Sequence, residues 1–96
     1  NIILNAVDAM GKKGNLIITT KKIKEKMQIT FKDTGIGIPE EAINKIFTPF
    51  YTSKTKGTGL GLTIANRIIE SHKGIIEGKN NKNKGASFII ILPCIN

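Results

Sequence analysis

The order of its hydrophobic patterns is the feature that most constrains the fold of this chain. Two segments carry apolar side chains at helical spacing, 1–10 and 60–71. A third, shorter helix is expected over 40–47, because Pro39 suits a first helical turn. Four short segments rich in β-branched residues predict strands paired as two hairpins: 16–20, 27–31, 74–77 and 87–92. This order predicts an α/β layer arrangement with a largely antiparallel sheet.

A length of 96 residues allows one small domain. Its longest uncharged apolar run, Phe88 to Leu92, is far shorter than the roughly 20 residues of a membrane-spanning helix. A single cysteine, Cys94, excludes an internal disulfide, and no cysteine or histidine cluster suggests zinc. We therefore expect a reducing, intracellular compartment. Because no capping residue precedes Asn1, we also expect the first helix to begin upstream and the domain to be N-terminally truncated.

The net charge of +8 has two interpretations. A basic excess suits a polyanionic partner, such as a nucleic acid, nucleotide phosphates or an anionic membrane. However, all but one of the basic residues are lysines, and guanidinium groups dominate the recognition of base edges. Sequence-specific DNA binding is therefore disfavoured, and most of the surplus charge is expected on solvated surface.

An aspartate and two glycines directly follow the second expected strand. Asp33, Gly35 and Gly37 stand in the run Asp-Thr-Gly-Ile-Gly-Ile-Pro. The glycines allow a close approach of the backbone to a ligand, and the carboxylate can accept a hydrogen bond from an exocyclic amine. The alternative is an ordinary Asx turn, in which Asp33 accepts from amides of its own loop.

A second glycine cluster leads into the helix at 60–71. Gly57, Gly59 and Gly61 are spaced GxGxG, which fits neither the phosphate-binding loop GxxxxGK[ST] nor the dinucleotide pattern GxGxxG. Free amides at a helix N-terminus favour an anion. A flexible hinge is the alternative interpretation.

Two asparagines lie four residues apart in the first helix. Asn1 and Asn5 therefore share a helical face, and their amide oxygens suit Mg²⁺. The alternative is that both amides cap the helix or face solvent. Farther along, the run Phe47-Thr-Pro-Phe50 forms an aromatic corner before the glycine-rich segment.

In this order, the four motifs resemble the asparagine box, first glycine box, phenylalanine box and second glycine box of sensor histidine kinases. The resemblance is to their catalytic, ATP-binding domain and extends over residues 1–96. It implies the Bergerat fold of the α+β class. That fold is a two-layer α/β sandwich, in which a mixed, mostly antiparallel sheet packs against about three helices.

The resemblance also implies roles for individual residues. Asn5 matches the asparagine that coordinates Mg²⁺ on the ATP phosphates, and Asn1 would lie beside the same phosphates. Asp33 matches the aspartate that reads the adenine amino group, while Gly35 and Gly37 let the backbone close over the base. Ala86 stands where many relatives have a hydroxyl residue, which leaves a polar partner for Asp33 from the last strand open.

The second glycine cluster matches the end of the ATP lid, whose amides contact phosphate. Position and charge suggest phosphate contacts from lid residues as well. The expected nucleotide-binding residues of this region are Thr52, Lys54, Lys56, Gly57, Thr58, Gly59, Leu60 and Gly61.

The implied function is that of a histidine protein kinase, in which this domain positions Mg-ATP for transfer of the γ-phosphoryl group in two-component signalling. The acceptor would be a histidine on an adjacent dimerisation domain that this chain lacks, in a homodimeric, cytoplasmic kinase portion. A response regulator would be an indirect partner, and no nucleic acid would be bound. His72, at a helix end, is not the expected acceptor, and no residue is assigned a certain catalytic role.

Three other functions remain open. An ATPase of the same fold would have a glutamate before the helix asparagine, where this chain has Leu4. An anti-sigma-factor serine kinase shares the boxes, although the run Phe47-Thr-Pro-Phe50 is more similar to histidine kinases. A basic nucleic-acid-binding module would bind in a salt-sensitive manner that does not depend on Asp33.

Overall fold

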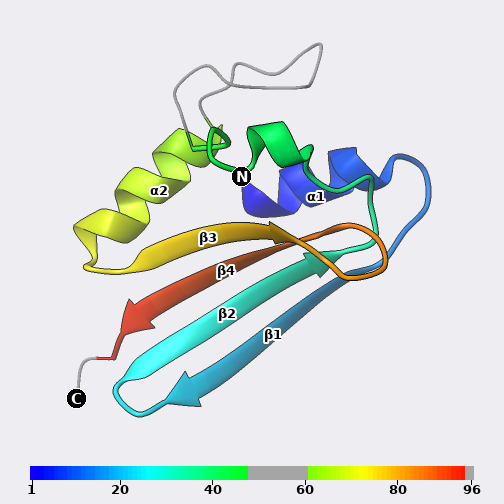
Figure 1. Ribbon diagram of the computed structural model, residues 1–96. Helices are drawn as coiled ribbons and strands as arrows, with labels where there is room; N and C mark the ends of the chain where they lie inside the picture. Colours follow the sequence, from blue (N-terminus) through cyan, green and yellow to red (C-terminus); the bar gives the residue numbers. More distant parts are fainter. Residues whose placement is uncertain (48–60, 95–96) are drawn as a thin grey trace.

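A four-stranded sheet forms one layer of the molecule, and two α-helices cover one of its faces (Figure 1). The computed structural model describes residues 1–47 and 61–94. Neither described helix is long and apolar enough to cross a membrane. The elements are α1 (Ile2–Met10), β1 (Leu16–Ile23), β2 (Lys26–Asp33), a 3₁₀ turn (Glu40–Ala42), α2 (Gly61–Ser71), β3 (Ile75–Asn80) and β4 (Ala86–Pro93).

The strand order is β1-β2-β4-β3, and each of these neighbouring pairs is antiparallel. The largely antiparallel sheet expected from the sequence is thus confirmed, with no parallel pair among the described strands. The last strand, β4, lies between β2 and β3, and its pairing with β2 aligns Lys32 with Ser87. This register brings the end of β2, where Asp33 stands, beside the beginning of β4.

The core lies between the sheet and the helices. Phe88 and Ile90 alternate with outward-facing residues of β4, so both point toward the helical layer. The Phe47 ring meets the Phe88 ring edge to face, with 6.4 Å between their centroids. The buried hydrophobic residues of this core cluster are Ile2, Ile46, Ile76, Phe88 and Ile90.

The two helices bury their apolar faces to different extents. In α1, Ile2 and Ala6 are one turn apart and buried. In α2, Leu62, Ala65 and Ile69 pack against the core at a spacing of three and four residues, but none of them is fully buried. α2 therefore lies on the core with a shallower contact than α1.

The expected helix over 40–47 is much shorter in the structure. Regular structure covers only the 3₁₀ turn Glu40–Ala42, and the next bond, from Lys45 N–H to the Ala42 carbonyl at 2.7 Å, continues as a turn. An eight-residue segment gains little from helix propagation, whereas burial of Ile46 in the core stabilises a tighter path. Within residues 1–47 and 61–94, the helical layer thus contains two α-helices and this single turn.

Candidate functional site

Asp33 ends β2 and is only 2% exposed. Its Oδ1 accepts hydrogen bonds from Gly35 N–H (2.9 Å) and from Ala86 N–H (3.0 Å). The first is the Asx-type bond of the alternative interpretation, and the second reaches across to β4. Neither bond uses Oδ2. The carboxylate is therefore held by one oxygen, which satisfies part of the hydrogen-bonding demand of a buried acid.

Gly85 allows β4 to begin against Asp33. Its φ is +84°, and a Cβ atom built on it would lie only 2.1 Å from the Asp33 carbonyl oxygen. No side chain fits there, since such contacts are far below van der Waals distance. Sequence analysis did not assign Gly85 or the Ala86 amide to the site. A glycine at the start of the last strand was the available signal, but its partner became visible only with the β2–β4 register.

The glycine loop after Asp33 packs against the last turn of α1. Gly35 is buried, and a Cβ atom on it would lie 2.6 Å from the backbone carbonyl carbon and oxygen of Ala9. The same carbonyl accepts a hydrogen bond from Ile36 N–H at 3.1 Å. Gly37 has φ of +81°, which glycine adopts without strain. Both predicted glycines are therefore required by local geometry.

One stripe of α1 connects this loop with the beginning of α2. Asn1, Asn5 and Ala9 are spaced four residues apart, so each is rotated by only about 40° from the last around the helix axis. Ala9 meets Gly35, whereas the Asn1 amide lies 3.6 Å from where a Cβ of Gly61 would be. Asn5 lies midway, about 6 Å along the axis from each.

Asn5 is half-buried, and Asn1 makes no side-chain capping bond to α1. The structure thus does not support helix capping as the role of the Asn1 amide. The α1 stripe thus lies against the Asp33 loop at Ala9 and against the N-terminus of α2 at Asn1.

A hydrogen bond joins described residues from the two sides of positions 48–60. The Thr63 hydroxyl, in the first turn of α2, donates to the Phe47 carbonyl at 3.0 Å. The Phe47 ring is partly buried and packs against the core. The remaining predicted residues, with Phe50 of the aromatic corner, lie outside the described residues: Thr52, Lys54, Lys56, Gly57, Thr58, Gly59 and Leu60.

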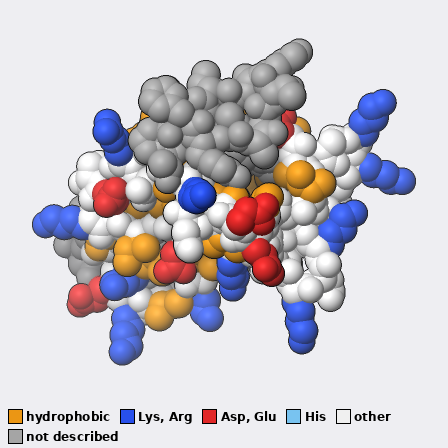
Figure 2. All heavy atoms as spheres, turned by 45° about the horizontal axis from the view of Figure 1, so that its top comes forward, with side chains coloured by type: hydrophobic (Ala, Val, Ile, Leu, Met, Phe, Trp, Pro, Cys, Tyr) orange, Lys and Arg blue, Asp and Glu red, His pale blue; other side chains and the backbone are white. Residues whose placement is uncertain are grey.

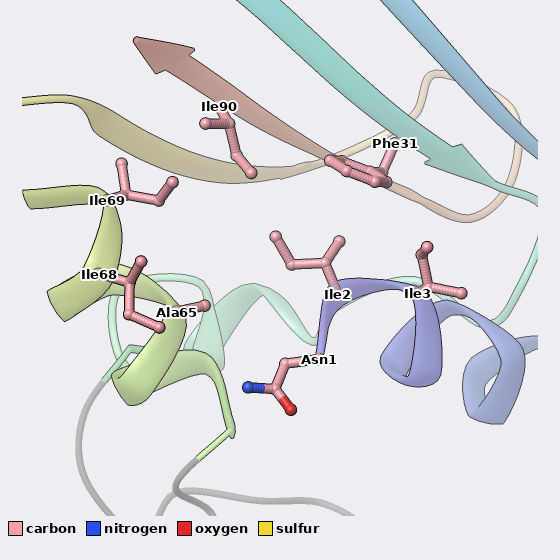
Figure 3. A pocket seen from close by; sticks show the side chains of 8 residues that line it. All are labelled: Asn1, Ile2, Ile3, Phe31, Ala65, Ile68, Ile69 and Ile90. Carbon is pink, nitrogen blue, oxygen red and sulfur yellow. The ribbon is translucent and has the colours of Figure 1, made fainter. Parts of the chain in front are cut away.

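A separate cavity of about 290 Å³ lies between α1, α2 and the sheet (Figure 3). Apart from Asn1 its lining is apolar, and it includes neither Asn5 nor Asp33. Its lining residues are Asn1, Ile2, Ile3, Phe31, Ala65, Ile68, Ile69 and Ile90. Apart from the Asn1 amide this lining offers no polar side chain to a base or a phosphate, so we distinguish the cavity from the site around Asp33.

The surface charge of the described residues is dispersed on the face shown in Figure 2. Lysine and arginine side chains project from most of its outline, with acidic side chains among them. This distribution fits the interpretation of the positive excess as mainly solvated surface.

Comparisons with known proteins identify the family of the chain. The family model described as "Histidine kinase-, DNA gyrase B-, and HSP90-like ATPase" matches residues 1–96. Sensor histidine kinase ZraS of Salmonella typhi is 43% identical over 96 residues, which cover 99% of this chain and 21% of ZraS. Sporulation kinase A of Bacillus subtilis is 43% identical over 93 residues, or 97% of this chain and 15% of that kinase.

A solved structure extends the match to three dimensions. The catalytic domain of histidine kinase ThkA, in a nucleotide-free form, superposes with a TM-score of 0.85 and 42% identity, over 96% of this chain and 60% of that chain. This chain spans about a fifth or less of the two curated relatives named above. The chain belongs to the family of histidine kinase-, DNA gyrase B- and HSP90-like ATPases, as the catalytic ATP-binding domain of a sensor histidine kinase.

Proposed function

We propose that residues 1–96 form one unit that binds Mg-ATP and presents the γ-phosphate to a histidine on an adjoining dimerisation domain. From there the phosphate would pass to an aspartate of a response regulator. One relative supports a response regulator as a partner, because histidine kinase ThkA has been crystallised in complex with the response regulator protein TrrA. The reaction would take place in the cytoplasm, where ATP is supplied.

The observation that carries the proposal is the fixed carboxylate of Asp33. Its Oδ1 is held by two backbone amides, which leaves Oδ2 to accept from the exocyclic amine of adenine. Guanine has a carbonyl oxygen at the equivalent ring position, which a carboxylate repels. Asp33 would therefore bind the base and also select it, while Gly35 and Gly37 bring the loop backbone close to it.

The α1 stripe would hold the phosphate end. No group of three or more histidine, cysteine, aspartate or glutamate residues able to hold a metal ion occurs among the described residues. One amide oxygen from Asn5, with Asn1 nearby, instead fits Mg²⁺, which is commonly held by one or two protein oxygens together with phosphates and waters. When bound, this ion would neutralise part of the phosphate charge.

The N-terminus of α2 would supply further phosphate contacts. It begins at Gly61, beside Asn1, and its free amides carry the positive end of the helix dipole. Contacts from Thr52, Lys54, Lys56, Gly57, Thr58, Gly59 and Leu60 complete the proposed set by charge and position. These groups position the nucleotide and stabilise charge, which is most of what phosphoryl transfer requires.

Transfer to a protein acceptor is favoured over hydrolysis. The residue before Asn5 is Leu4, whose side chain is 65% exposed and cannot take a proton from an attacking water. An ATPase function would need a general base from another position of the chain.

The test is binding of a non-hydrolysable ATP analogue by calorimetry, with Asp33→Asn and Asn5→Ala. Asparagine can still accept from Gly35 and Ala86, but it loses the charge, so we expect about 10- to 100-fold weaker binding. Asn5→Ala should weaken binding only when Mg²⁺ is present and match the wild type in EDTA. Asn83→Ala, at an exposed turn, is the matched control. Equal affinities of wild type and Asp33→Asn would refute the assignment of the base site.

A further inference from the structure

Two asparagines at the end of β3 hold the loop that follows Asp33. The side chain of Asn80 forms a reciprocal pair of hydrogen bonds with the backbone of Ile38, 42 residues away. Ile38 N–H donates to Asn80 Oδ1 at 2.6 Å, and Asn80 Nδ2 donates to the Ile38 carbonyl at 2.7 Å. The amide thus pairs with Ile38 as a backbone peptide group of a neighbouring strand would.

Asn81 holds the other end of the same loop. Its Nδ2 donates to the Asp33 carbonyl at 2.9 Å and to the Lys84 carbonyl at 3.1 Å, with a longer contact of 3.3 Å to the carbonyl of Ala86. Its Oδ1 accepts from the Ser87 hydroxyl. Asn81 therefore both closes the β3–β4 turn and ties that turn to the residue that would read the base.

Between these two attachments the other hydrogen bonds of the loop are made at Thr34, Gly35 and Ile36, all before Gly37. Gly35 and Gly37 give it more backbone freedom than any other residue type would. The Ile36 side chain is 85% exposed and adds no packing, so the loop depends on its backbone bonds, such as that from Ile36 N–H to the Ala9 carbonyl. A Cβ on Gly37 would lie 2.9 Å from Asn80 Oδ1, which places the Asn80 amide directly against this glycine.

We infer that Asn80 is a positioning residue for nucleotide binding, which holds the Gly35–Ile38 backbone in the conformation that receives the adenine base. The inference rests on the proposed function. Asn80 would act through Ile38, without touching the nucleotide itself. A loop fixed in advance loses less conformational entropy when the ligand binds, and this raises affinity. The effect belongs to the base end of the site, so it should be independent of Mg²⁺.

The experiment compares Asn80→Ala with the matched control Asn83→Ala from the same turn. Affinity is measured by calorimetry for two ligands, the ATP analogue with Mg²⁺ and ADP in EDTA. We expect Asn80→Ala to bind both ligands about threefold to tenfold more weakly, by the same factor, since both contain adenine. Asn83→Ala should bind both as the wild type does. Asn80→Asp keeps the acceptor for Ile38 N–H but sets a carboxylate oxygen against the Ile38 carbonyl, which repels it, so its affinity should also fall below that of the wild type.

Amide hydrogen exchange separates positioning from a general loss of stability. In Asn80→Ala the Gly37 and Ile38 amides should exchange faster than in the wild type, and saturating nucleotide should slow them again, while amides of α2 keep their protection. Faster exchange across the whole sheet would overturn the inference, as would unchanged affinity or a loss confined to the Mg²⁺ complex. If Asn80→Ala does not fold, the same criteria apply to Asn80→Asp. Failure of the wild type to bind either ligand would instead refute the proposed function.

Discussion

At the scale of single residues, Asp33 is surrounded by positions that leave no room for a side chain. Gly85 approaches its carbonyl oxygen, and Gly35 approaches the backbone of Ala9. The two bonds that hold Asp33 Oδ1 come from backbone amides. The base end of the site is therefore built mainly from main chain, and its shape depends on glycines that contribute no chemistry of their own.

Gly35→Ala should destabilise the domain and weaken nucleotide binding. The added methyl group would meet the Ala9 backbone at 2.6 Å, so the loop and α1 must separate, at a cost of about 1–3 kcal/mol. Urea unfolding followed by circular dichroism measures the change in the free energy of unfolding.

Gly61→Ala is the comparison for stability. Its methyl group would lie 3.6 Å from the Asn1 side chain, an ordinary contact, and alanine favours a helix more than glycine does. We expect no loss of stability from it. Equal destabilisation by the two changes would contradict the crowding described at Gly35.

Sequence alone predicted Asp33, Gly35 and Gly37 through the order of the four motifs, because this motif by itself is equally compatible with an ordinary Asx turn. It could not predict the bond from Ala86 N–H, which links residues 53 positions apart. That bond depends on the pairing of β2 with β4, and no local pattern encodes such a register. The same reason hid Asn80 and Asn81, which appeared only as ordinary turn residues.

At the scale of elements, β4 is one of the two inner strands of the sheet and carries two of its buried core residues, Phe88 and Ile90. It lies between β2 and β3. Its inward side chains belong to the core under the helical layer, and one of them meets the aromatic ring of Phe47. β1 lies at the edge, and most of its residues are exposed. Substitutions of similar size should therefore have very different effects in these two strands.

Ile90→Ala should lower the free energy of unfolding by about 2–5 kcal/mol, because Ile90 is 8% exposed and its loss leaves a void in the core. Ile17→Ala, in the edge strand, removes a side chain that is 56% exposed and should cost no more than about 1 kcal/mol. Urea unfolding of both variants gives the comparison. A cost for Ile17→Ala as large as that for Ile90→Ala would show that the outer face of β1 is covered in solution.

The sequence located both helices and all four described strands, but it missed several lengths. β1 extends to Ile23 and β2 begins at Lys26, so the turn of their hairpin consists of Lys24 and Glu25 alone. Charged residues had suggested a longer connection there. They fit in the strands because the side chains of residues 21–26 are exposed, so each lysine keeps its charge in water. The shortened helix after Pro39 has the opposite cause, which is burial of Ile46.

At the scale of the whole molecule, α2 separates the proposed phosphate end of the site from His72. Gly61 begins this helix beside the α1 stripe, whereas His72 follows its last residue. A helix of 11 residues is about 16 Å long. The single histidine of the sequence is therefore remote from the proposed phosphate end.

The chain alone should bind ATP without phosphorylating His72. In addition to the distance, His72 Nδ1 already lies 2.8 Å from the Ile68 carbonyl, with which it can hydrogen-bond. Incubation with radiolabelled ATP, followed by alkali treatment, detects phosphohistidine. His72→Ala should bind nucleotide with unchanged affinity. An alkali-stable label that disappears in His72→Ala would contradict the geometry described for α2.

The hydrogen bond from Thr63 to Phe47 has a consequence for how such a domain tolerates change. This bond holds the two described positions on either side of residues 48–60 close together. A change in the number of residues between them would leave the bond in place, and each doubling of a loop's length costs only about 0.6 kcal/mol in closure entropy. Added residues between Phe47 and Gly61 should therefore cost the fold little, whereas nucleotide binding, for which contacts from this segment are proposed, should be sensitive to them.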